Sequence, residues 1–149
     1  MNAFNLLKPE LKTLVKKRFK KPTPVQKEVI PEILKGHNIL TISETGSGKT
    51  EACLLPVFNL WLKEKPKPIS ILYITPLRSL NRDLLKRVLW WSQELGFDVS
   101  VRHGDTSAYE RKMQTENPPD MLISTPETLQ SVLVGKKIRE HLKNIKYII

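Results

Sequence analysis

A chain of 149 residues with 40% hydrophobic content can bury a core of its own, which excludes a disordered segment and fits one domain or part of one. Its formal net charge of +10 favours a polyanionic partner, because Lys and Arg gain from releasing the counterions of phosphate backbones. The single cysteine, Cys53, excludes a disulfide framework within the chain, and no run approaches the roughly 20 apolar residues of a membrane helix, so we expect a soluble, cytoplasmic protein without a membrane partner.

Residues 1–37 are predicted to form a helical N-terminal region, with helices over residues 10–18 and 24–35. The first helix carries much of the chain's charge, because residues 8–21 contain seven Lys or Arg against a single acid. Such a run is typical of a solvated helix face, and contact with nucleic acid is the alternative interpretation.

After this region, apolar runs typical of strands alternate with helical patterns. The predicted strands cover residues 38–43, 69–75, 99–103 and 121–124, and a further one opens at Tyr147. The predicted helices between them cover residues 51–62, 81–95 and 127–133, with Gly96 and Gly135 close behind the last two. This alternation predicts an α/β fold of three layers, a parallel sheet with helices on both faces.

The stretch SETGSGKT, residues 43–50, has the composition of a phosphate-binding loop. Glycines let backbone N–H groups curl around a phosphate, Lys49 adds a fixed positive charge, and Thr50 offers a hydroxyl to Mg²⁺. The strict pattern G-x-x-x-x-G-K-[ST] fails at its first position, where Ser43 stands, but an apolar run precedes the loop and a helical pattern follows it. The predicted nucleotide-binding residues here are Thr45, Gly46, Ser47, Gly48, Lys49, Thr50 and Glu51, of which Lys49 and Thr50 are also the predicted catalytic residues and Thr50 the metal ligand.

The segment PTPVQ, residues 22–26, allows two interpretations. Thr23 and Gln26 have the spacing of a capping box, and Pro24 suits the first helical position. Gln26 also offers the acceptor and donors that can read the edge of adenine. The local chemistry leaves both interpretations open, so Thr23 and Gln26 join the predicted nucleotide site.

Five segments together resemble one family, the superfamily two helicases. In chain order they are PTPVQ, SETGSGKT, TPLRSL, HGDTSAYER and STPETL. DEAD-box RNA helicases would show PTRELA and TPGR at the third and fifth places, whereas the segments here are more similar to the Lhr (large helicase-related) branch. The resemblance implies that residues 1–149 are part of a RecA-like first motor domain that uses ATP and Mg²⁺.

The resemblance also implies a second set of residues, which grip the sugar-phosphate backbone of one strand of DNA or RNA without reading its sequence. These predicted nucleic-acid-binding residues are Pro76, Leu77, Arg78, Gly104, Asp105, Thr125, Pro126 and Glu127. Each group follows a predicted strand, and ligands of open parallel sheets bind at the carboxyl ends of strands. For Thr125 and Pro126, a simple helix cap is the alternative interpretation.

In the family the strand that begins like Tyr147 runs into a box of carboxylates that hold Mg²⁺ and orient water. We expect residues 1–149 to end before this box and before the second RecA-like domain, and therefore to bind ATP without hydrolysing it. The alternatives are a DEAD-box RNA helicase, a P-loop kinase or other small NTPase, and a nucleic-acid-binding module with a decayed loop. Intact Lys49 and Thr50 speak against decay.

Overall fold

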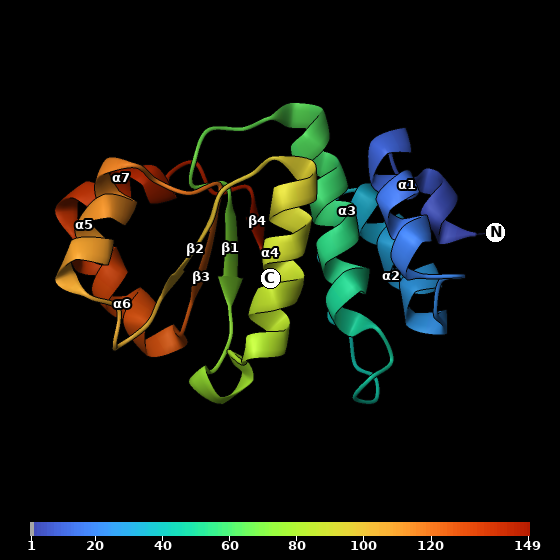
Figure 1. The fold of residues 1–149 in the computed structure, drawn as a ribbon, viewed down its shortest axis with the longest axis horizontal. Coiled ribbons are helices and arrows are strands. Elements are labelled where there is room, and N and C mark those ends of the chain that lie inside the picture. The colour runs from blue at the N-terminus through green and yellow to red at the C-terminus, as the bar shows by residue number, and fades with distance from the viewer. Residues whose placement is uncertain (1) are drawn as a thin grey trace. The chain divides into compact units, whose positions relative to one another are not determined.

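The structure, a computed structural model, describes residues 2–149, and Figure 1 shows its elements. The chain divides into two compact units, Met1–Lys65, called here the N-terminal unit, and Pro66–Ile149, the C-terminal unit. Within the described residues, no helix has the length and apolar character needed to span a bilayer.

The N-terminal unit is helical. Its elements are η1 (Ala3–Leu6), α1 (Pro9–Arg18), α2 (Pro24–Leu34) and α3 (Lys49–Glu64). The predicted helices are confirmed, with ends that differ by one or two residues. α2 packs against α3, and α3 buries Leu54, Leu55 and Phe58 completely. Each such side chain stabilises the unit by roughly 1.5–3 kcal/mol relative to full exposure.

The prediction of a strand over residues 38–43 is wrong for this structure. The segment is irregular, and Ile39, Leu40 and Ile42 are exposed, Leu40 to 86% and Ile42 to 87%. An apolar run becomes a strand only when a neighbouring strand accepts and donates its backbone hydrogen bonds. Within residues 2–149 no strand pairs with this segment, so its apolar composition alone does not make it one.

The C-terminal unit contains the sheet. Its strands are β1 (Ile71–Ile74), β2 (Val99–Arg102), β3 (Met121–Ser124) and β4 (Tyr147–Ile148). All pairings are parallel, and the order is β2-β3-β1-β4. Its helical elements are η2 (Leu77–Ser79), α4 (Arg82–Leu95), α5 (Ala108–Glu116), α6 (Pro126–Val134) and α7 (Lys136–Leu142). The sequence patterns do not predict α5 and α7, which the structure adds.

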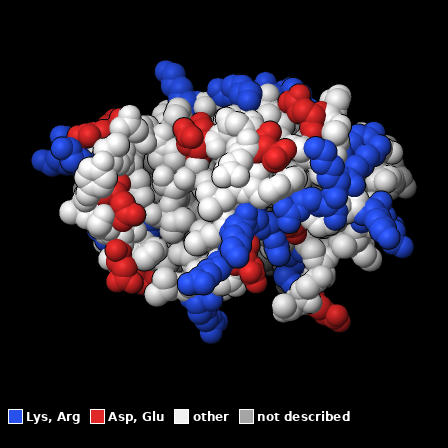
Figure 2. Space-filling model, in the orientation of Figure 1, with Lys and Arg blue, Asp and Glu red and all other residues white. Residues whose placement is uncertain are grey.

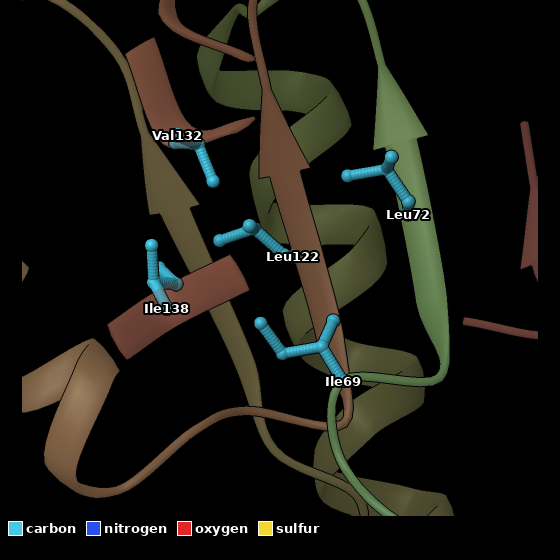
Figure 3. Close-up of a cluster of buried hydrophobic side chains, with 5 residues drawn as sticks. All are labelled: Ile69, Leu72, Leu122, Val132 and Ile138. Carbon is cyan, nitrogen blue, oxygen red and sulfur yellow. The ribbon is translucent and has the colours of Figure 1, made fainter. Parts of the chain in front are cut away.

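The two faces of the sheet bury alternate residues of the same strand. Leu122 of β3 belongs to a fully apolar cluster with Leu72 of β1, Val132 of α6 and Ile138 of α7 (Figure 3). Its neighbour Ile123 lies on the opposite face, beside residues of α4. Successive side chains of a strand point to opposite faces, so a strand that is buried at every position must be covered twice. The predicted three-layer arrangement with helices on both faces is confirmed (Figure 1).

Candidate nucleotide and nucleic-acid site

The phosphate loop of the N-terminal unit is a tight turn that leads into α3. Gly46 and Gly48 have φ angles of +81° and +88°, a region that residues with a side chain avoid. Gly48 is the N-cap residue of α3, and no side chain caps this helix. The N–H groups of the first turn of α3 therefore lack the side-chain acceptor that usually satisfies one of them, which is how helix N-termini bind anions.

Lys49 closes this loop. Its ammonium group donates hydrogen bonds to the backbone carbonyls of Ser43 and Glu44, and the Ser43 and Ser47 hydroxyls are 2.7 Å apart. The ammonium group is thus held over the loop rather than extended into solvent. An anion bound to the loop amides would meet this positive charge at short range, where a charge-assisted hydrogen bond is stronger than a neutral one.

Gln26 connects α2 to the phosphate loop. Its side-chain carbonyl accepts from the N–H of Thr23 at 3.0 Å, and the Thr23 hydroxyl accepts from the N–H of Gln26 at 3.4 Å. The capping box predicted from the sequence is therefore present. The amide nitrogen of Gln26 also donates to the carbonyl oxygen of Gly48 at 3.2 Å, and the side chain is only 2% exposed. Gln26 thus supports the phosphate loop in addition to capping α2. Adenine reading by Gln26 stays a prediction.

The other predicted residues of the loop differ in accessibility. Thr45 is exposed and Thr50 half-buried, whereas Glu51 is buried at 5% exposure. Within residues 2–149 no group of three or more His, Cys, Asp or Glu is placed to hold a metal ion. The Thr50 hydroxyl is an oxygen ligand of the kind that Mg²⁺ accepts. Nucleotide phosphates and water would be the other ligands of such an ion.

In the C-terminal unit, three strand ends bring the predicted nucleic-acid residues to one edge of the sheet. Ile74 of β1 and Arg102 of β2 are both in register with Ser124 of the central strand β3. The loops that follow these strands therefore start side by side. The exposed residues that they carry from the predicted set are Pro76, Leu77, Arg78, Gly104, Asp105, Pro126 and Glu127.

Thr125 lies among these loops but is itself only 3% exposed. Its hydroxyl oxygen accepts from the N–H of Thr128 at 3.4 Å and lies 3.0 Å from the Thr128 hydroxyl. The helix-cap interpretation is confirmed by this geometry. A phosphate contact by Thr125 stays a prediction, and the exposed Pro126 and Glu127 are its accessible neighbours.

The turn after β2 is held by a residue that the prediction did not single out. Arg111 of α5 donates to the carbonyl oxygens of Thr106 at 2.9 Å, and of His103 and Gly104 at 3.2 Å each. Its segment, HGDTSAYER, contains the arginine, but no local rule links it to the turn. Burial and then the charge of Arg111 lower the pKa of Arg102, which precedes the turn, and a guanidinium nevertheless stays charged in proteins. Arg111 therefore holds a positive charge against the carbonyls of this turn, and Arg102 directly precedes the turn at the end of β2.

The comparisons with known proteins agree with this arrangement. The sequence matches the DEAD/DEAH box helicase family over residues 23–149. The chain is 37% identical over 161 aligned positions to the ATP-dependent helicase Lhr-Core of Sulfolobus acidocaldarius. This alignment covers 99% of this chain and 18% of that protein. It is 40% identical over 144 residues to the ATP-dependent helicase Lhr-Core protein 2 of Thermococcus barophilus, which covers 85% of this chain and 17% of the relative.

Among solved structures, the fold is similar to that of the Mycobacterium smegmatis helicase Lhr bound to ssDNA and AMP-PNP. The TM-score is 0.87 at 28% identity, over 99% of this chain and 20% of the other. The RecA-like fold and the resemblance to the Lhr branch are thereby confirmed. The chain spans about a fifth of the length of the relatives that it matches. With the family matched over most of its residues, this chain belongs to the DEAD/DEAH box helicases.

Proposed function

We propose that this chain is the ATP-binding and strand-gripping part of an ATP-dependent helicase motor. The observation that carries the proposal is the phosphate loop, in which Gly46 and Gly48 turn the backbone into an uncapped helix start and Lys49 holds its charge over the turn. The Lhr relative is bound to AMP-PNP and ssDNA, which supports the same pair of ligands for this chain.

The loop would hold the phosphates of ATP through its backbone N–H groups and the ammonium group of Lys49. Thr50 would be the protein's hydroxyl ligand to Mg²⁺, which supplies neutralisation of the charge that develops on the phosphates. Phosphoryl transfer asks a protein mainly for position and charge, and of the recurring parts these residues would supply the loop amides, the lysine and the metal-binding hydroxyl. Gln26 would keep the carbonyl of Gly48 turned toward α2, because its amide donates to that oxygen.

The strand-end loops of the C-terminal unit would hold a single strand of DNA or RNA by its backbone. Arg78 is exposed on η2, and the exposed Gly104 offers its backbone N–H beside Arg111, whose guanidinium donates to the Gly104 carbonyl. Groups of this kind bind phosphate without reading bases, so the binding would be tolerant of sequence. Translocation would belong to the longer protein, with a second RecA-like domain in the same chain.

Calorimetry with ATP tests the nucleotide site. Lys49→Ala should lower ATP affinity roughly ten- to hundredfold, because a charge-assisted contact contributes about 1.5–3 kcal/mol. Lys63→Ala is the matched control, since Lys63 is an exposed lysine of the same helix. Equal ATP affinity of the two variants would contradict the phosphate-loop assignment.

Fluorescence anisotropy with a labelled single strand tests the strand grip. Arg78→Ala should weaken binding of all sequences alike and reduce the slope of log affinity against log salt by about 0.7. Arg139→Ala, an exposed arginine of α7, is the control for lost charge. A variant at Arg78 that binds as tightly as this control would contradict the proposed contact. If the chain were a P-loop kinase, its affinity for single strands would not depend on Arg78.

A further inference from the structure

The proposed sites leave the most basic part of the chain unused. Residues 8–21 carry seven of the 25 Lys and Arg residues and one of the 15 acids. In the structure this segment is α1 with its flanks, and Lys and Arg side chains gather over it where Figure 1 labels α1 (Figure 2). The segment lies in the N-terminal unit, whereas the predicted strand-gripping residues all lie in the C-terminal unit.

The lysines of α1 form a row. Lys8, Lys12, Lys16 and Lys20 are spaced four residues apart in the sequence. Lys12 and Lys16 lie in α1, on one face with Cβ atoms about 6 Å apart, whereas Lys8 is the N-cap residue and Lys20 follows the helix by two residues. The opposite face carries Leu11, Leu14 and Val15, all buried. Lys16 and Lys20 are exposed, as are the flanking Lys17 and Lys21.

Among residues 2–149, no acid forms an ion pair with a lysine of this row. Within the described residues, the lysines of the segment form no ion pair, and the single acid, Glu10, is unpaired as well. Like charges four residues apart destabilise a helix slightly. The helix dipole favours cations in the last turn, which accounts for Lys16 and Lys17, but it disfavours Lys8 and Lys12 near the start. Within the row, helix stability therefore accounts for Lys16 but not for Lys8 and Lys12.

The helix that carries the row is fixed at both ends. The N–H of Lys8 donates to the side-chain oxygen of Asn59 in α3 at 2.7 Å. After the other end, the ring of Phe19 lies against the ring of Phe4 in η1, with centroids 6.4 Å apart. The backbone that carries the row is therefore anchored within the unit, and a preorganised backbone lowers the entropic cost of binding a rigid partner.

We propose that the α1 row binds the phosphate backbone of double-stranded nucleic acid. A duplex is a stiff polyanion with one charge per about 1.7 Å of axis, twice the density of one of its strands, and it suits a rigid row of point charges. The row contains lysines rather than a mixture of base-reading side chains, so the contact is independent of sequence. This inference rests on the proposed nucleic-acid function and adds a second contact, on the other unit.

The test is duplex binding by the 149-residue chain with Lys12→Gln, Lys16→Gln and Lys20→Gln combined. Gln is a good helix former, and circular dichroism and ATP calorimetry would show that the fold and the nucleotide site are intact. The matched control replaces Lys136, Lys137 and Arg139 of α7 by Gln, which removes the same charge from exposed positions elsewhere.

The α1 variant should bind a short duplex at least about fivefold more weakly at low salt, with a salt slope smaller by about two to three, near one for each lysine. The control variant should lose markedly less duplex affinity. Equal losses in the two variants, no loss in the α1 variant, or a loss confined to single strands would overturn the proposal. So would wild-type binding to vesicles of anionic lipid or to polyglutamate in preference to the duplex.

Arg78→Ala separates this inference from the function on which it rests. If both sites exist, Arg78→Ala weakens single-strand binding and the α1 variant weakens duplex binding. If only the α1 row binds, the Arg78 variant behaves as wild type, and the strand grip is wrong while the row stands. If only the strand grip exists, the α1 variant matches its control, and the row is wrong.

Discussion

Each unit contains a turn proposed to meet phosphate, and in each a side chain from the start of a helix holds that turn. In the N-terminal unit Gln26, the third residue of α2, donates one hydrogen bond to the carbonyl of Gly48. In the C-terminal unit Arg111, the fourth residue of α5, donates to three carbonyls of the turn after β2. One support is a buried neutral amide, and the other is a cation.

The difference follows from what each turn already has. The phosphate loop has its own cation, Lys49, and its own helix start, so a neutral partner that adds no charge is sufficient to hold Gly48. The turn after β2 follows a strand and has no lysine within it, and Arg111 supplies both its shape and part of its charge. Variants can separate shape from charge in each turn.

The largest effect is expected from Gly48→Ala. A Cβ atom there would lie 2.6 Å from the Gln26 amide nitrogen, at a φ of +88°, and the Gln26 side chain is held by its own hydrogen bonds. We expect a loss of roughly 2–4 kcal/mol in the free energy of unfolding and no measurable ATP binding. Gly36→Ala is the control, because Gly36 has φ +89° with no atom within 4 Å of the added Cβ. If denaturant unfolding shows that Gly48→Ala and Gly36→Ala lose equal free energies of unfolding, the collision with Gln26 is excluded.

Gln26→Glu and Gln26→Ala separate the cap from the support. Glu keeps the acceptor of the capping box but has no amide to donate to Gly48, whereas Ala loses both bonds. Gln26→Ala should cost about 1–3 kcal/mol of stability, and Gln26→Glu less. Both should weaken ATP binding, and calorimetry with ATP and GTP would also test adenine reading. If Gln26→Glu binds ATP as tightly as wild type and prefers ATP over GTP to the same extent, neither the hydrogen bond to Gly48 nor an adenine contact contributes to nucleotide binding.

Arg111→Lys keeps the positive charge at the turn after β2 but removes the hydrogen bonds that hold the turn in its conformation. A lysine cannot reproduce three hydrogen bonds from a planar guanidinium. Single-strand affinity should fall by about 1–2 kcal/mol, roughly 5- to 30-fold, in Arg111→Lys, and further in Arg111→Gln, which loses the charge as well. If anisotropy shows the Lys variant binding as wild type, Arg111 contributes charge alone, and the comparison between the two turns fails.

The smallest effect concerns a further capping box, which Ser107 and Glu110 form at the start of α5. The N–H of Ser107 and then its hydroxyl, both donating to the Glu110 carboxylate, lower the pKa of Glu110, whereas Gln26 has no titratable group. A carboxyl whose pKa is lower in the folded state stabilises the fold above its unfolded-state pKa, and this contribution disappears as the pH falls through the folded-state pKa. Glu110→Gln should keep the cap and flatten this acid-side dependence slightly. Thermal melts between neutral and acidic pH that are parallel for the two proteins would contradict this.

Local sequence was sufficient for features that depend on neighbours along the chain. Both capping interpretations, at Thr23 and at Thr125, are confirmed because a cap involves residues only three positions apart. The end of α4 at Gly96, with φ +74°, has the same origin. The positive φ angles of Gly46 and Gly48 likewise agree with the loop that their spacing predicted.

The tertiary structure decided what depends on distant partners. The segment 38–43 has the composition of a strand, yet pairing determines a strand, and residues 2–149 provide it with no partner. The contact of Gln26 with Gly48 spans 22 residues, and the side-by-side strand ends of β1, β2 and β3 follow from a sheet order that no local pattern specifies. Hydrogen bonds between remote groups form only after packing brings them together, so composition could identify the phosphate loop but not the side chains that hold it.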